Sequence, residues 1–152
     1  MTIEAANQSD GPVIQVGGLS SHYGGKEVLR DVSFSVMREE IFVIMGASGS
    51  GKTTLMRQLI GLSQPAQGSV TLLGYDLTKI NKSELFEVRK HIGVAFQGGA
   101  LINSMSVIEN VELPLNQNTT LDPSTIRIMS RMKLDMMSLG DAENLMPAQL
   151  SG

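Results

Sequence analysis

Short apolar runs, separated by turns rich in glycine, proline and asparagine, dominate the first hundred residues of the chain. The run at 28–36 alternates, so that Val28, Val32, Phe34 and Val36 share one side of an extended chain. Other runs are continuously apolar, which is typical of strands that are buried on both faces. The predicted strands are residues 13–16, 28–36, 41–45, 69–73 and 92–96, with a turn at 21–25.

Helical periodicity and end signals predict helices at residues 53–60, 84–90, 107–111 and 123–139. Gly61 is expected to end the first helix and Ser83 to cap the second. Pro114 should stop the third, and Asp122 should cap the fourth, which opens with Pro123 and ends at Gly140. Helical spacing predicts that the buried stripe of the fourth helix consists of Met129, Met132, Met136 and Leu139.

One stretch between a predicted strand and a predicted helix matches the phosphate-binding pattern G-x-x-x-x-G-K-[ST] at every fixed position. Its residues are Gly46, Ala47, Ser48, Gly49, Ser50, Gly51, Lys52, Thr53 and Thr54. Glycines let successive N–H groups turn inward around a phosphate, and the following helix directs its positive dipole end there. In this pattern Lys52 contacts the β- and γ-phosphates, and the Thr53 hydroxyl binds Mg²⁺.

Three other interpretations of this stretch are weaker. A glycine-rich turn that binds nothing would not need a preceding strand, nor Lys52 and Thr53 at the fixed positions of the motif, yet the sequence has them all. A dinucleotide site needs the spacing G-x-G-x-x-G, which residues 46–54 lack. A GTPase is disfavoured because residues 81–84, Asn-Lys-Ser-Glu, only superficially resemble the guanine-reading Asn-Lys-x-Asp. The residues therefore favour a nucleoside-triphosphate site.

Composition narrows the class of protein. The chain has 152 residues, of which 41% are apolar, enough for the core of one ordinary domain. A net charge of −3 argues against a broad basic surface, so we expect no nucleic-acid partner. The absence of cysteine excludes a disulfide scaffold and cysteine-ligated zinc. Neither a signal peptide nor an apolar run of bilayer length is present, so a membrane role would come through a partner.

Four pieces in order resemble the ATP-binding subunit of ATP-binding-cassette (ABC) transporters. They are Tyr23 in a glycine-containing turn, the Walker A loop at 46–54, the Q-loop at 95–97 (Ala-Phe-Gln), and 150–152 (Leu-Ser-Gly), the start of a Leu-Ser-Gly-Gly-Gln signature. The resemblance implies an α/β P-loop NTPase fold with an N-terminal antiparallel β part, an incomplete core sheet and a partial helical subdomain. It also implies an ATPase core at 13–97 and a helical part at 98–152, whereas the polar residues 1–12 predict a flexible leader.

The resemblance also assigns roles to residues. Tyr23 would stack on adenine, although an aromatic residue here could simply cover the sheet. Gln97 would bridge Mg²⁺ and the attacking water, although it could be a plain polar strand end. Ser151 and Gly152 would face the ATP bound by Lys52 of a second subunit in a head-to-tail homodimer. Hydrolysis would then drive transmembrane permease subunits, with residues 98–105 bordering the docking groove or packing within the helical part.

A narrower resemblance, carried by residues 96–101, 104–111 and 113–115 (Leu-Pro-Leu), is to the branch linked to bacterial phospholipid trafficking and toluene tolerance. It implies a peripheral protein on the cytoplasmic face of the bacterial inner membrane. The alternatives are an ABC subunit for another substrate and a non-transport ABC ATPase acting on DNA or ribosomes. A nucleotide-binding fragment without turnover is a further alternative.

Several parts of the family pattern do not occur in the chain. No Asp or Glu follows a long apolar strand as the Walker B motif requires, and His22 and His91 precede the place of the switch histidine. We interpret His22 as a turn residue, His91 as a helix-end residue, and Glu109 and Glu112 as the solvated face of a short helix. We therefore expect a truncated sequence, inactive alone, in which strand 41–45 has open edges and the isolated chain tends to aggregate.

Overall fold

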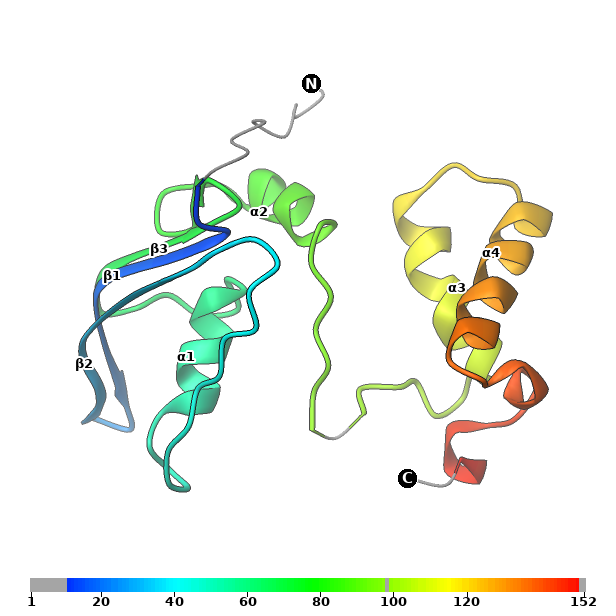
Figure 1. Cartoon of the computed structure of the whole chain (residues 1–152), viewed down its shortest axis with the longest axis horizontal. Coiled ribbons are helices and arrows are strands. Elements are labelled where there is room, and N and C mark those ends of the chain that lie inside the picture. Colours follow the sequence, from blue (N-terminus) through cyan, green and yellow to red (C-terminus); the bar gives the residue numbers. More distant parts are fainter. Residues whose placement is uncertain (1–10, 98, 151–152) are drawn as a thin grey trace. The chain divides into compact units, whose positions relative to one another are not determined.

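The computed structural model describes residues 11–97 and 99–150, apart from the side chain of Tyr23 (Figure 1). These residues fall into two compact units, which are divided between Gly93 and Val94. The predicted leader, residues 1–12, lies largely outside the described residues. None of the described helices is both long enough and apolar enough to span a bilayer.

A four-stranded antiparallel sheet in the order β2-β1-β3-β4 forms the frame of the first unit. Its strands are β1 (Ile14–Tyr23), β2 (Lys26–Val36), β3 (Gln67–Leu72) and β4 (Tyr75–Asp76). The predicted turn at 21–25 is wrong in extent, since His22 lies in β1 and pairs with Glu27. The turn is only Gly24–Gly25, whose φ angles of 58° and 79° suit a two-residue hairpin.

Helix α1 (Lys52–Leu59) packs one face on this sheet. Leu55 and Leu59 join Val16, Leu19 and Val70 in the buried core. The predicted end at Gly61 is confirmed: its φ is 71°, and the Leu62 N–H donates to the carbonyl of Arg57 at 2.7 Å. The core therefore fixes the helix that follows the phosphate-loop motif.

Helix α2 (Lys82–Arg89) begins two residues earlier than predicted. Its cap is Asn81, not Ser83, because the Asn81 side chain accepts from the Ser83 and Glu84 N–H groups while Glu84 bonds back to the Asn81 N–H. His91 is exposed just beyond the helix end, as expected. The sequence therefore located the helix but not its capping box.

The predicted strands at 41–45 and 92–96 are not strands in the structure. Their residues are largely exposed, Ile41 to 92% and Met45 to 87%. A strand needs hydrogen-bonding neighbours, and no described strand pairs with either segment. The prediction was wrong because it rested on apolar composition alone, and no neighbouring strand in the described residues pairs with these segments or buries them.

The second unit is helical: α3 (Val107–Asn118), α4 (Pro123–Met136), and the short 3-10 turns η1 (Gly140–Ala142) and η2 (Pro147–Gln149). Pro114 does not stop α3, contrary to expectation. Pro114 is exposed inside the helix, where its ring removes one helical N–H donor without ending the helix. Asp122 caps α4 as predicted, accepting from the Ser124 and Thr125 N–H groups.

The predicted methionine stripe of α4 is also wrong. The buried face carries Ile126, Ser130 and Leu134, whereas the exposed residues include Met129, Met132, Met136 and Leu139. Both sets repeat at helical spacing, so periodicity alone could not choose between them. The helix ends at Met136, and Ser138, whose φ is 58°, turns the chain away before it reaches Gly140.

Candidate functional site

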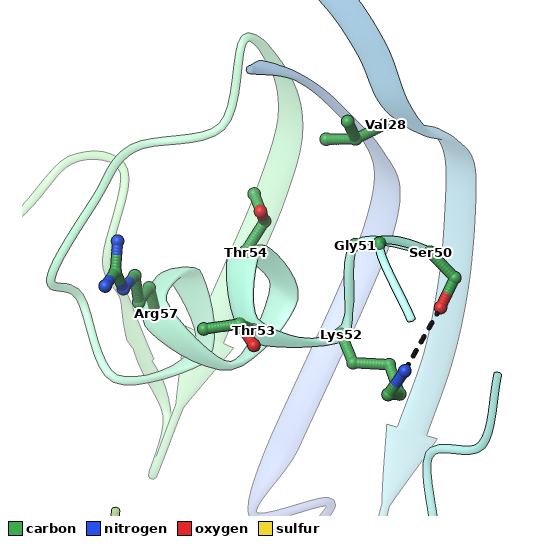
Figure 2. Close-up of a pocket in the computed structure, with 8 residues that line it drawn as sticks. Val28, Ser50, Gly51, Lys52, Thr53, Thr54 and Arg57 are labelled. Atoms are coloured by element: carbon green, nitrogen blue, oxygen red, sulfur yellow. Dashed lines mark hydrogen bonds between the residues drawn. The ribbon is translucent and has the colours of Figure 1, made fainter. Parts of the chain in front are cut away.

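The phosphate-loop motif lies where an exposed segment enters α1 (Figure 2). The Lys52 ammonium donates to the carbonyls of Gly46 at 2.8 Å and Ala47 at 2.7 Å, and to the Ser50 hydroxyl at 3.4 Å. The side chain therefore folds back along its own loop. A cation held this way is already positioned where an anion cradled by the loop would lie.

The N-terminus of α1 differs from those of the other described helices. Side chains of Asn81, Ser106 and Asp122 cap α2, α3 and α4. Gly51 caps α1, and no side chain in the described residues bonds to its first-turn N–H groups, nor does that turn contain an acidic residue. The first N–H groups of a helix need partners, and the dipole end there is positive. This end of α1 suits an anion.

A pocket of about 310 Å³ opens at the same place. It is lined by Val28, Gly49, Ser50, Gly51, Lys52, Thr53, Thr54 and Arg57. Two of these residues, Lys52 and Arg57, are cations, and none is a carboxylate. The pocket therefore combines positive charge, free N–H groups and hydroxyls, which is the chemistry of a phosphate site.

Arg57 was not predicted as a site residue. It lies one helical turn after Thr53, so both side chains share a face of α1. That spacing is visible in the sequence and could have identified it. Val28, which was predicted only as a strand residue, lines the pocket from β2.

The other predicted site residues lie elsewhere. Tyr23 is the last residue of β1, and its side chain lies outside what the structure describes. Gln97 is exposed in a turn of the second unit, whereas Thr53 belongs to the first. Ser151 and Gly152 lie outside the described residues. Their roles, and the pairing of Thr53 with Gln97 at a metal ion, stay predictions.

No group of three His, Cys, Asp or Glu residues within the described ranges could hold a metal ion by itself. Thr53 lies exposed at the start of α1, beside Lys52. A Mg²⁺ ion bound there would need oxygen ligands from nucleotide phosphates, which is how Mg²⁺ usually binds in such sites.

Comparisons with known proteins agree on the family. The ABC transporter family profile matches residues 29–152. The intermembrane phospholipid transport system ATP-binding protein MlaF of Haemophilus influenzae is 38% identical over 140 residues, covering 92% of this chain and 53% of that protein. The probable ribonucleotide transport ATP-binding protein mkl of Mycobacterium leprae is 37% identical over 142 residues, covering 93% of this chain and 41% of that protein.

Among solved structures, a dimeric post-hydrolysis state of the ATP-binding cassette MJ0796 bound to ADP and Pi superposes with a TM-score of 0.81. It is 29% identical and covers 91% of this chain and 63% of that one. The chain spans about half the length of the curated relatives it matches, from 40% to 54%. With its family profile, its relatives and its fold in agreement, the chain belongs to the ABC transporter family.

Proposed function

We propose that this chain supplies the phosphate-binding half of an ATP site and that the whole protein hydrolyses ATP. The observation that carries the proposal is the Lys52 ammonium, held on the loop carbonyls beside the start of α1, where no described side chain bonds to the first-turn N–H groups. Phosphoryl transfer depends mostly on positioning and charge stabilisation, which this arrangement supplies. Thr53 would bind the Mg²⁺ that accompanies the phosphates.

The remaining parts of the ATP site would come from other segments and from a second subunit. Tyr23 would stack on adenine, and Gln97 would bridge Mg²⁺ and the attacking water. Ser151 and Gly152 of one subunit would face the ATP held by Lys52 of the other. The dimeric, ADP-bound state of the structural relative supports a composite site of this kind.

We further propose that ATP hydrolysis powers transmembrane permease subunits that move phospholipid, with this chain peripheral on the cytoplasmic face of the bacterial inner membrane. The similarity to MlaF supports lipid as the substrate. The similarity to mkl favours a second candidate, ribonucleotide transport. The two candidates predict different bound molecules in the purified complex with the permease: phospholipid in the first case and ribonucleotide in the second.

The test uses the full-length protein purified with its membrane partner. We expect ATP hydrolysis that falls at least about 100-fold in Lys52→Ala, because a preorganised cation at the phosphates is lost. Lys82→Ala is the matched control, since Lys82 is an exposed lysine at the start of α2. Equal activity in Lys52→Ala and the control would contradict the proposed site. Mass spectrometry of molecules bound to the complex distinguishes phospholipid from ribonucleotide.

A further inference from the structure

The segment between α4 and the last described residue returns along the first turn of α3. Two main-chain bonds attach it: the Val107 N–H donates to the Leu145 carbonyl at 2.9 Å, and the Ile108 N–H donates to the Glu143 carbonyl at 3.0 Å. Both donors belong to the first turn of α3, where N–H groups have no partner within the helix. The start of α3 and residues 143–145 are therefore fixed to each other.

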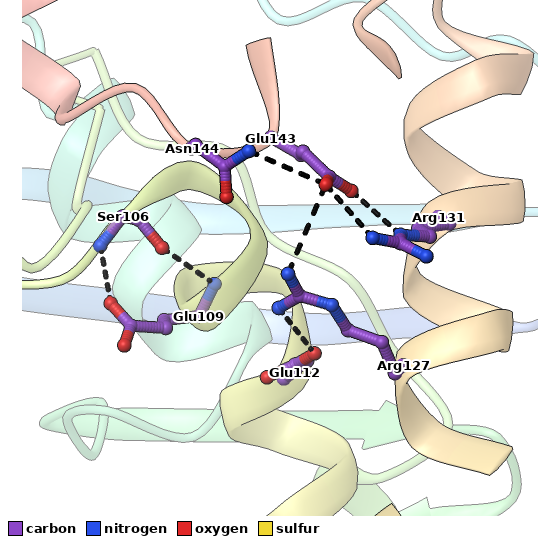
Figure 3. A network of polar contacts seen from close by, with 7 residues as sticks. All are labelled: Ser106, Glu109, Glu112, Arg127, Arg131, Glu143 and Asn144. Carbon is purple, nitrogen blue, oxygen red and sulfur yellow. Dashed lines mark hydrogen bonds and ion pairs between the residues drawn. The ribbon is translucent and has the colours of Figure 1, made fainter. Parts of the chain in front are cut away.

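The Glu143 side chain binds α4 at the same time (Figure 3). Arg131 donates from Nε to Glu143 Oε2 at 2.7 Å and from Nη2 to Oε1 at 2.9 Å. Such a two-pronged pair fixes orientation as well as distance. The Arg131 hydrogen bonds hold the pKa of Glu143 below its ordinary value of 4.5, so the carboxylate stays charged at neutral pH.

Arg127 extends this network from α4 to α3. Its Nη2 lies 3.9 Å from Glu143 Oε1, and its Nη1 lies 3.1 Å from Glu112 Oε1. The Glu143 and Glu112 side chains are only 18% and 17% exposed. Glu112 is therefore not the solvated residue that the sequence predicted. Partial burial makes these pairs more consequential than isolated surface ion pairs.

The attached segment then leads to Leu150. Within it, the Met146 N–H donates to the Gln149 side chain and the Gln149 N–H to the Met146 carbonyl, both at 2.8 Å. Leu150 packs on the cluster of Val107, Ile108 and Leu134. From Glu143 to Leu150 the path of the chain is thus determined by the two helices, up to the residue directly before Ser151.

Resting on the proposed role of Ser151 and Gly152 at the ATP of a second subunit, we propose that Glu143 is a positioning residue for that contact. Joined to Arg131 and Arg127, it fixes residues 143–150, which lead directly to Ser151. If Glu143 were purely structural, its loss would destabilise the helical unit and would not act selectively on the ATP site of the partner subunit. The two roles differ in which of the two composite sites fails.

The test uses full-length heterodimers that combine Glu143→Gln with Lys52→Ala. With the two substitutions on different subunits, one composite site keeps both an intact phosphate loop and an intact signature segment. With both on one subunit, no composite site is intact. We expect the first arrangement to retain one occluded molecule of a non-hydrolysable ATP analogue per dimer, and the second to bind it about 10- to 100-fold more weakly, the range for a misplaced contact.

Equal retention in the two arrangements would overturn the proposal, because a general folding defect does not depend on which subunit carries it. If the wild-type dimer occludes no nucleotide, the proposed function fails instead. Arg131→Lys, which keeps the charge but removes the two-pronged geometry, is a milder variant should Glu143→Gln fold poorly. Glu87→Gln is the control, since it removes the 2.8 Å pair with Lys90 in the first unit and should not distinguish the arrangements.

Discussion

At the scale of single residues, Gly51 connects the sheet to the phosphate site. Its φ is 93°, and a Cβ there would meet the Val28 carbonyl oxygen and Leu29 Cδ2, each at 2.9 Å. The carbonyl belongs to strand β2 and cannot move aside without distorting the sheet. Only glycine therefore lets the loop turn into α1 this close to β2.

We predict that Gly51→Ala lowers the stability of the full-length protein by more than about 1–3 kcal/mol, the usual cost of a strained backbone, and weakens ATP-analogue binding. Gly49→Ala is the matched comparison, because Gly49 also has a positive φ of 79° but nothing lies within 4 Å of its Cβ position. It should show the conformational cost alone. Thermal unfolding measures the stability of both variants. Equal losses of stability in Gly51→Ala and Gly49→Ala would show that the clash with β2 does not matter.

At the scale of elements, α4 has two apolar faces, and among the described residues only one of them is packed. Leu134 is 5% exposed and contacts the α3 cluster, whereas Met132 is 60% exposed. We predict that Leu134→Ala costs about 2–5 kcal/mol of unfolding free energy, because it removes buried volume. Met132→Ala should change stability by about 0.5 kcal/mol or less. Chemical denaturation compares the two, and a larger loss in Met132→Ala would restore the methionine stripe as the packed face.

Local signals in the sequence sufficed where short-range chemistry decides the outcome. The helix after the phosphate-loop motif, its end at Gly61 and the Asp122 cap each depend on a few neighbouring residues. Features that depend on distant partners were not predictable in this way. The packed face of α4, the burial of Glu112 against Arg127 and the missing strand at 41–45 are set by what another segment offers.

At the scale of the whole molecule, the apolar segment 41–45 is the feature that most needs a further packing partner, because its side chains are exposed. It leads into the phosphate loop, yet it has no strand neighbour among the described residues. The curated relatives that it matches are about twice as long as this chain, and additional residues of a longer protein could pair with this segment. We predict that the 41–45 amides exchange rapidly with deuterium in the 152-residue polypeptide and at least about 100-fold more slowly in the full-length protein, where strand pairing would protect them.

Strand β3 is the internal control for this experiment. The Val70 side chain is fully buried and its residue pairs with Val16, so β3 amides should be protected in both polypeptides. Rapid exchange at 41–45 in the full-length protein would mean that the loop is held by α1 and β2 alone. Protection already present in the 152-residue polypeptide would mean that the first unit pairs this segment by itself. In either case the nucleotide site would not depend on additional strands, and the expected tendency of the isolated chain to aggregate would lose its physical basis.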